Sequence, residues 1–249
     1  MSSPTPVVTL YEAPRSNKAE SVIPGVTPPV QSTPLLSVPP VGLLHAMIAP
    51  CPGVAATISP ADVEAAGDAI RSAKVFVTQL EQPLDAARRG LEIARAAGVT
   101  TILNPAPAGP LPDEVLALCD YVTPNETEAE ALTGVAVGDE AGAREAGEAF
   151  LERGVGTAVI TLGERGALLH GRETSILVPA FDAGPVVETT GAGDAFNGGF
   201  AVALAEGASP LEAVRLGCAT AGLSVTRPGT APSMPARAEV AALLAKTAE

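Results

Sequence analysis

The sequence predicts an α/β fold in which a mostly parallel β-sheet lies between two layers of helices, a three-layer α/β/α arrangement. Two observations support this prediction. From residue 57 onward, short and continuously apolar runs alternate with longer segments whose apolar residues recur at helical spacing. Hydrophobic residues make up 47% of the 249-residue chain, yet there is no Trp and there are only five Phe. We therefore expect small aliphatic side chains to pack Ala-rich helices closely on both faces of the sheet.

Residues 1–56 are expected to form an irregular, Pro-rich segment, and residues 57–249 a folded domain. The first 53 residues contain eleven of the 24 prolines and four charged residues, without helical or alternating periodicity. Because proline lacks an amide donor, we expect neither helices nor central strands in this segment. The alternative interpretation is a Pro-rich arm that binds a partner, which would make the chain an interaction protein.

The expected elements of the domain follow in a regular order. A strand over 74–80 (KVFVTQL) precedes a helix over 83–98, with Pro83 at its start and Gly98 at its C-terminal cap. Further strands are expected over 99–104, 121–124, 157–163, 166–170 and 174–178, the last two as a hairpin. Further helices are expected over 112–119, 125–134, 140–153, 192–206, 209–225 and 236–246. In such a sheet, ligands bind at the carboxyl ends of the strands.

The net charge and the cysteines exclude several classes of function. A formal net charge of −13 disfavours binding to nucleic acids and anionic membranes. Cys51, Cys119 and Cys218 are odd in number and lack CxxC spacing, which indicates reduced thiols rather than disulfides or a zinc site. No apolar run has the length of a membrane span, and the N-terminus lacks the pattern of a signal peptide. We therefore expect a cytoplasmic protein.

Three of the predicted strand ends carry residues that suit a ligand. Glu81 follows the run at 74–80, where it either accepts hydrogen bonds from ligand hydroxyls or is an exposed loop residue. Asn125 and Glu128 share a helix face, as ligand contacts or as an N-cap with a solvated acid. The segment 161–166 (TLGERG) has two glycines, which suit either close approach to a nucleotide or a plain hairpin turn.

The sequence VETTGAGDAFNGG at 187–199 gives the most specific signal. Gly191, Ala192 and Gly193 precede a helix, so its unpaired amides and its dipole favour an anion such as phosphate. Asp194 is a poor phosphate ligand, but it suits a base that we expect the helix N-terminus to keep ionised, acting on a hydroxyl that attacks a phosphoryl group. The alternative is an aspartate placed in the first turn for the helix dipole alone.

Several ordered motifs from about residue 57 to the C-terminus resemble those of the ribokinase family of PfkB-type carbohydrate kinases. They are QLEQP, LNPAPAGPLPDEVLALCDYVTPNETEAEALTG, VITLGERGALL, VVETTGAGDAFNGGFAVAL and SVTRPGTAPSMP. The resemblance implies the Rossmann-like ribokinase fold and transfer of the γ-phosphate of ATP to a sugar hydroxymethyl group, with Mg²⁺ and activation by K⁺. It also implies that Asp194 is the base and that the amides of Gly191, Ala192 and Gly193 form the anion hole.

The resemblance assigns the remaining site residues as well. Glu81 matches a sugar contact, Asn125 lies near the ATP phosphates, and Glu128 completes an NxxE motif linked to magnesium and phosphate. The nucleotide contacts would be Thr161, Leu162, Gly163, Glu164, Arg165, Gly166 and Cys218. The K⁺ loop would use Glu188, Thr190, Ser224, Arg227, Gly229 and Ser233. Family members usually have aspartate where this chain has Glu188, which keeps the charge on a longer side chain.

The resemblance stops at the N-terminal side. Family members begin with further strands, a small β lid, an early aspartate that holds sugar hydroxyls and a GGKGxN motif, and residues 1–53 match none of these. We therefore expect an N-terminally incomplete domain, for which a homodimer formed through the lid is an open question. An ATP-dependent kinase with ribose as the favoured sugar is the leading hypothesis. The alternatives are a kinase for another sugar or nucleoside, and a nucleotide-binding remnant without catalysis.

Overall fold

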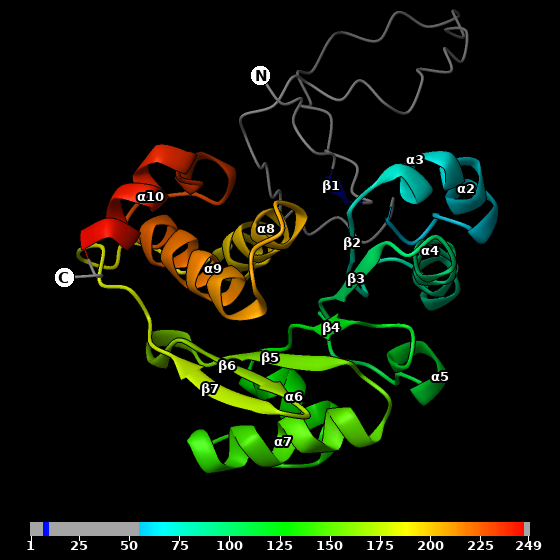
Figure 1. Cartoon of the computed structure of the whole chain (residues 1–249), viewed down its shortest axis with the longest axis horizontal. Coiled ribbons are helices and arrows are strands. Elements are labelled where there is room, and N and C mark those ends of the chain that lie inside the picture. Colours follow the sequence, from blue (N-terminus) through cyan, green and yellow to red (C-terminus); the bar gives the residue numbers. More distant parts are fainter. Residues whose placement is uncertain (1–6, 10–54, 247–249) are drawn as a thin grey trace, which may run out of the picture.

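The computed structural model describes residues 7–9 and 55–246, which build a seven-stranded sheet in the order β1-β2-β3-β4-β5-β6-β7 (Figure 1). The strands are β1 (Val7–Thr9), β2 (Val75–Thr78), β3 (Thr100–Leu103), β4 (Tyr121–Val122), β5 (Thr157–Thr161), β6 (Ala167–Gly171) and β7 (Thr174–Val178). Strands β1 to β5 pair in parallel, and β5, β6 and β7 pair antiparallel. The predicted strands and the predicted hairpin are confirmed.

The helices also follow the predicted order. They are α2 (Pro60–Ala65), α3 (Gly67–Ser72), α4 (Leu84–Ala96), α5 (Asp113–Leu116), α6 (Glu126–Thr133), α7 (Glu140–Glu152), α8 (Ala192–Ala205), α9 (Pro210–Ser224) and α10 (Arg237–Lys246). Two short 3₁₀ turns, η1 (Gly163–Arg165) and η2 (Ala231–Ser233), complete the described residues. Helices α2 and α3 were not predicted. The Ser59 side chain and the Asp62 carboxylate form a capping box at the start of α2, a signal that the sequence carries.

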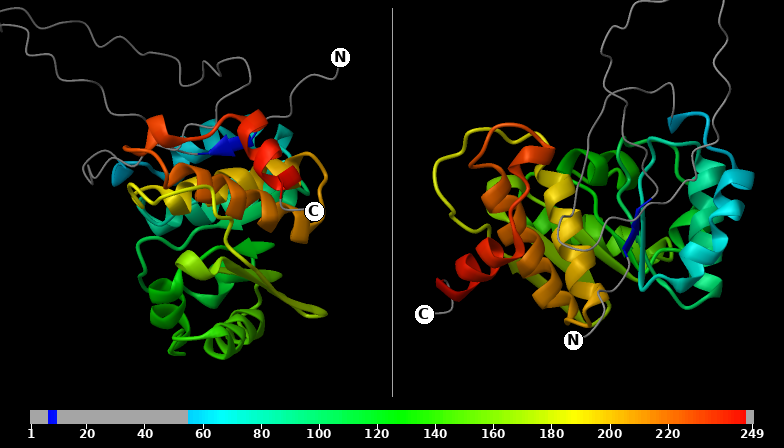
Figure 2. Two further views of the ribbon diagram at one scale, coloured as in Figure 1. Left: turned by 90° about the vertical axis from the view of Figure 1, so that its left-hand side faces the viewer. Right: turned by 90° about the horizontal axis from the view of Figure 1, so that it is seen from above.

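Alternate residues of each strand pack on opposite faces of the sheet, which gives the predicted three layers. Phe76 of β2 belongs to the apolar core shared with helices α2 to α7, whereas Val75 and Val77 belong to the core shared with α8, α9 and α10. Figure 1 shows α8 and α9 side by side, and the two views of Figure 2 place α10 next to α9 and away from α7. The prediction of an α/β/α fold is confirmed.

Residues 1–53 were expected to contain no central strand, and three of them form a strand at the edge of the sheet. The short run Val7–Thr9 pairs in parallel with β2, Val7 opposite Val75 and Thr9 opposite Val77. All three residues are β-branched and none is proline, so every backbone amide of the run remains a donor. The strand lies at the edge of the sheet, the position that a Pro-rich neighbourhood tolerates best.

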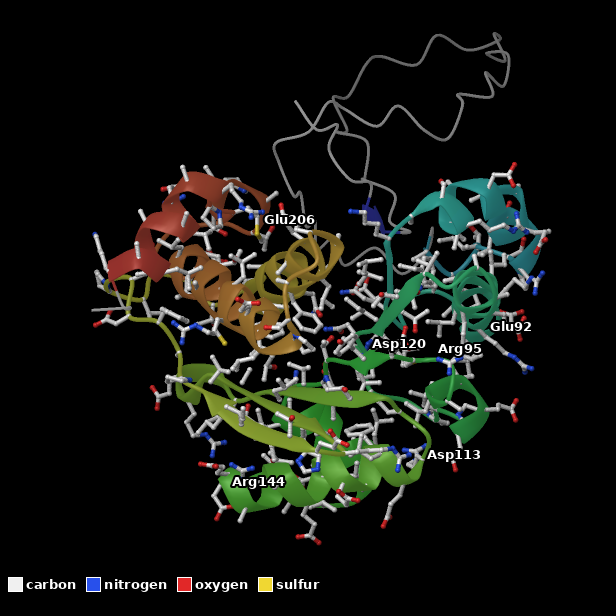
Figure 3. The ribbon with its side chains drawn as sticks, in the orientation of Figure 1. Glu92, Arg95, Asp113, Asp120, Arg144 and Glu206 are labelled. Atoms are coloured by element: carbon white, nitrogen blue, oxygen red, sulfur yellow. The ribbon has the colours of Figure 1, made fainter. Side chains whose placement is uncertain are left out.

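Polar contacts tie helix α4 to the sheet beside the apolar cores. The Asp120 carboxylate accepts a hydrogen bond from the Thr101 amide at 2.9 Å, and its other oxygen lies 3.4 Å from the Arg95 guanidinium at the end of α4. Arg95 and Asp120 are labelled in Figure 3, where they point toward one another. These contacts join α4, β3 and the start of β4. Within the described residues, no helix has both the length and the apolar character needed to cross a bilayer.

Candidate active site

The carboxyl ends of four parallel strands and the start of α8 surround a cavity of about 180 Å³. The side chains that line it follow β2, β3 and β4 directly, or belong to the last residue of β5 and the first turns of α6 and α8. They are Gln79, Glu81, Asn104, Ala106, Thr123, Asn125, Glu128, Thr161, Gly191, Gly193, Asp194 and Asn197. The cavity lies where parallel sheets bind their ligands. It brings together the predicted residues of three strand ends with Asp194.

The first turn of α8 presents backbone amides to this cavity. Gly191 is the N-cap, with a φ of 84°, and no side chain caps the helix. A Cβ at this position would be strained by the positive φ and would press on Thr230 at 3.3 Å, so glycine is required here. The Ala192 amide donates to the Thr189 carbonyl at 3.1 Å. The amides of Gly191, Gly193 and Asp194 have no acceptor among the described residues, which leaves them available to an anion.

Asp194 has one oxygen held and the other unpaired. The Gln79 side-chain amide donates to Asp194 Oδ1 at 3.2 Å. Asp194 Oδ2 is buried and has no hydrogen-bond partner within the described part of the chain. Burial raises the pKa of the Asp194 carboxyl, the hydrogen bond from Gln79 lowers it, and the nearby charge of Glu81 raises it again. The sequence argument considered only the helix N-terminus, which favours the ionised form, and it missed the opposing effect of burial.

Asn125 and Glu128 form the N-cap that the sequence allowed, and both lie at the cavity, where a role as ligand contacts stays a prediction. The Asn125 side chain accepts from the Glu128 amide and the Glu128 carboxylate accepts from the Asn125 amide, each at 2.9 Å, which is a capping box at the start of α6. Both residues also line the cavity. Burial raises the pKa of the Glu128 carboxyl against the lowering effect of the Asn125 amide. A backbone bridge between Asn125 and Thr161 holds the ends of β4 and β5 together.

The residues of segment 161–166 lie in different environments, some at the cavity and others in the turn that leads into the hairpin. Thr161 lines the cavity and Leu162 is buried, whereas Gly163 and Glu164 are exposed. Gly166 has a φ of 101°, and a Cβ there would lie 2.0 Å from the Val178 carbonyl oxygen. The hairpin turn alone therefore requires Gly166. Arg165 of the same turn donates to the Glu126 carboxylate at 2.9 Å and is not directed at a ligand.

The six residues predicted for a K⁺ loop lie outside the cavity, and several of them are close to one another. The Glu188 carboxylate accepts from the Gly229 amide at 2.7 Å, and the Glu188 amide donates to the Val225 carbonyl, next to Ser224. The Ser224 and Ser233 hydroxyls donate to the carbonyls of Ala221 and Thr230, Arg227 pairs with Glu239, and Thr190 is exposed. Within the described residues, no cluster of His, Cys, Asp or Glu side chains is suited to a metal ion.

Cys218 does not line the cavity. It lies in α9, 5% exposed, in the apolar core between α9 and the sheet. Burial raises the pKa of its thiol to about 12. The resemblance had placed Cys218 near a nucleotide, but its side chain is packed in this core and not among the residues that line the cavity.

Comparison with known proteins assigns this chain to a family. Residues 47–237 match the model of the pfkB family of carbohydrate kinases, which is more than half of the chain. The chain belongs to this family. It is 45% identical over 170 residues to a ribokinase of Haemophilus influenzae, covering 68% of this chain and 55% of that protein. It is 41% identical over 189 residues to a ribokinase of Staphylococcus aureus, covering 76% of this chain and 62% of the relative.

Solved structures give the same result for this pfkB-family chain. The structure of Arabidopsis thaliana ribokinase complexed with ribose and ATP matches with a TM-score of 0.70 and 34% identity, over 76% of this chain and 60% of that one. Ribokinase from Thermotoga maritima matches with a TM-score of 0.70 and 39% identity, over 78% and 63% of the two chains. The chain therefore spans about 55–63% of the length of these four relatives.

The cavity of this pfkB-family chain contains polar residues that were not predicted. Thr123 donates to Asn197 Oδ1 at 2.6 Å, and Asn197 Nδ2 donates to the Gly193 carbonyl at 3.0 Å, which fixes the first turn of α8. Asn104 Nδ2 faces the Thr123 carbonyl at 3.4 Å, and its Oδ1 is buried without a partner in the described part of the chain. Asn104, Thr123 and Gln79 each follow a strand directly in the structure, whereas the sequence analysis had placed them inside the predicted strands. Nothing local marked Asn197.

Proposed function

We propose that this chain is an ATP-dependent sugar kinase of the ribokinase type, which transfers the γ-phosphate of ATP to the 5-hydroxyl of D-ribose and gives D-ribose 5-phosphate. Membership of the pfkB family supports the reaction class. The choice of ribose is supported by ribokinase relatives at 41% and 45% identity and by the Arabidopsis ribokinase, whose structure contains ribose and ATP. We place the kinase domain at residues 57–249.

One observation carries this proposal: the unpaired Asp194 Oδ2 lies in the same cavity as the free amides of the α8 N-terminus. A carboxylate oxygen without a donor can take the proton of a sugar hydroxyl as that hydroxyl attacks phosphorus. Amides of Gly191, Gly193 and Asp194 then stabilise the charge on the transferring oxygens. The two requirements of phosphoryl transfer, a base and an anion site, thus meet within one helical turn.

The other cavity residues fit the ligands of this reaction. Glu81 lines the cavity as an exposed carboxylate that suits hydroxyl groups of a sugar. Asn125 and Glu128 lie where ATP phosphates and Mg²⁺ would bind, since Mg²⁺ prefers carboxylate oxygens together with substrate phosphates. Bound Mg²⁺ would neutralise charge on those phosphates. Thr161 and the exposed turn after it would face the rest of the nucleotide.

We also propose that K⁺ binds at the loop that Glu188 and Gly229 hold together. Backbone carbonyls are abundant there, and a monovalent cation prefers such oxygen ligands. A homodimer remains a prediction.

The test is ATP-dependent phosphorylation by the purified full chain across a panel of pentoses, hexoses and nucleosides, with and without K⁺. Ribose should be the best substrate, and K⁺ should raise the rate. Asp194→Asn should lower kcat at least about 100-fold, the lower end for loss of a general base. Asp139→Asn is the matched control, because Asp139 caps α7 away from the cavity and asparagine caps equally well. A parent protein without turnover on any sugar, or an Asp194→Asn variant of normal rate, would refute the proposal.

A further inference from the structure

The loop after β2 contributes the Gln79 side chain to the cavity, and the proposed reaction assigns it no role so far. Gln79 follows β2 directly, lines the cavity and donates to Asp194 Oδ1 at 3.2 Å. The two residues are 115 positions apart in the chain. A neutral donor from the loop after β2 is therefore directed at one oxygen of the proposed base.

The geometry points to Gln79 as a positioning residue for Asp194: its amide occupies Oδ1 so that Oδ2 alone faces the substrate hydroxyl. This inference rests on the proposed function. It is supported by the different environments of the two Asp194 oxygens, by the fixed backbone of Gln79 and by the acidic surroundings of Asp194. Asp194 Oδ2 is buried and unpaired within the described residues, so the two oxygens of one carboxylate have different tasks. Without the Gln79 hydrogen bond, the carboxylate could rotate about its side-chain bonds and present either oxygen.

The backbone that carries Gln79 is itself held in place. The buried Gln82 side chain donates to the Gln79 carbonyl at 2.8 Å and to the Thr78 hydroxyl at 2.5 Å, which closes the turn after β2. The Leu80 amide donates to the Ala106 carbonyl at 2.9 Å and ties this turn to the one after β3. Gln79 is therefore presented on a fixed backbone, as positioning requires.

The charges around Asp194 explain why a neutral donor is useful at this place. The charged side chains that line the cavity together with Asp194 are Glu81 and Glu128, and both are acids. The burial of Asp194 and the negative charge of Glu81 favour the protonated form of Asp194, which cannot act as a base. A hydrogen bond donated to the ionised carboxylate favours the charged form instead, and it does so without a cation that would compete with Mg²⁺ for the phosphates.

The test compares Gln79→Leu and Gln79→Met, which both remove the donor, with Asp139→Asn, which changes a carboxylate outside the cavity and leaves Gln79 and the turn after β2 intact. In the full chain, the pKa of Asp194 is measured from its ¹³Cγ chemical shift, assigned with Asp194→Asn. The Gln79 variants should raise this pKa because a bond to the charged form is lost, whereas Asp139→Asn should leave it unchanged. Two variants at position 79 keep the test decisive if one of them does not fold.

The kinetic arm uses the pH profile of kcat/KM for ribose. The acidic limb should move to higher pH in the Gln79 variants, with a loss of about tenfold at neutral pH, which is the lower end for a hydrogen bond to a charged group. An Asp194 pKa and a pH profile identical to those of the parent would overturn the inference. The carboxyl titration needs no turnover, so a parent protein that lacks kinase activity refutes the proposed function while the role of Gln79 is still decided by the NMR result.

Discussion

Replacement of Thr123 by valine tests the hydrogen bonds that join Thr123, Asn197 and Gly193 in the lining of the cavity. Thr123 is 1% exposed, and its hydroxyl is the donor to Asn197 Oδ1, at 2.6 Å. Valine has nearly the same shape, so the change removes the donor and leaves the Asn197 oxygen buried and unpaired. A buried polar group left without its partner costs about 1–3 kcal/mol. For a domain of this size, 1 kcal/mol corresponds to about 2–4 °C in Tm, so we expect Tm to fall by about 2–12 °C.

The matched control is Thr220→Val, which removes a hydroxyl from another buried threonine, in α9. Thr220 is 7% exposed, and its hydroxyl donates at 2.7 Å to the Leu216 carbonyl, one turn earlier in the same helix. That carbonyl keeps its helical hydrogen bond when the hydroxyl is lost, so no polar atom is left unpaired. Thermal unfolding of the two variants, followed by circular dichroism, gives the comparison.

The same variant should also affect the ligand site. Asn197 Nδ2 holds the Gly193 carbonyl at 3.0 Å, so an Asn197 side chain that turns away to find a donor releases the first turn of α8. ATP affinity, measured by titration calorimetry, should then be weaker in Thr123→Val than in Thr220→Val. Equal Tm values and equal ATP affinities for the two variants would refute the reasoning from the network.

Two further predictions concern packing and the cysteines. Gly90→Ala should destabilise the fold by about 1–3 kcal/mol, the usual cost of overpacking, because the new Cβ would lie 2.4 Å from the Phe76 ring. Gly138→Ala is the control, since a Cβ there meets open space and the change should be nearly neutral. Urea unfolding measures both variants, and equal midpoints would contradict the packing argument. Burial raises the pKa of the Cys119 and Cys218 thiols to about 12, so both should resist iodoacetamide at about pH 8 in the folded chain and react after denaturation. Mass spectrometry locates the label. Rapid labelling of either residue in the native protein would contradict the prediction, because it would show that the thiol is accessible.

The local parts of the structure were predictable from the sequence, and the contacts between distant residues were not. The hairpin strands and α7, capped by Asp139, follow from signals within a few residues of each element. Asp194 was predictable because three small residues before a helix leave amides free. Gln79 was not, since a glutamine after a strand has no distinctive pattern and its partner is 115 residues away.

The same reasoning explains the residues whose surroundings differ from expectation. Cys218 was placed near a nucleotide by the resemblance to the family, but its exposure depends on how α9 packs on the sheet, a long-range contact that the local sequence does not show. The Ala192 amide was counted with its neighbours, and only the turn geometry shows that the Thr189 carbonyl engages it. Strand β1 pairs with a strand more than sixty residues later, a long-range contact that local pattern does not encode.

The placement of α8 on the opposite face of the sheet from α4 and α7 has a consequence for the synthesis of this protein. The ribosome makes residues 60–178, and with them all strands from β2 to β7 and one complete layer of helices, before it makes α8. Until α8 and α9 dock, the described residues provide no cover for Val75, Val77, Ile102 and Val159 on the second face, and the nascent chain is open to aggregation or to a chaperone. Helix α8 also carries Asp194 and the free amides, so the docking that covers this face also brings the proposed base to the cavity.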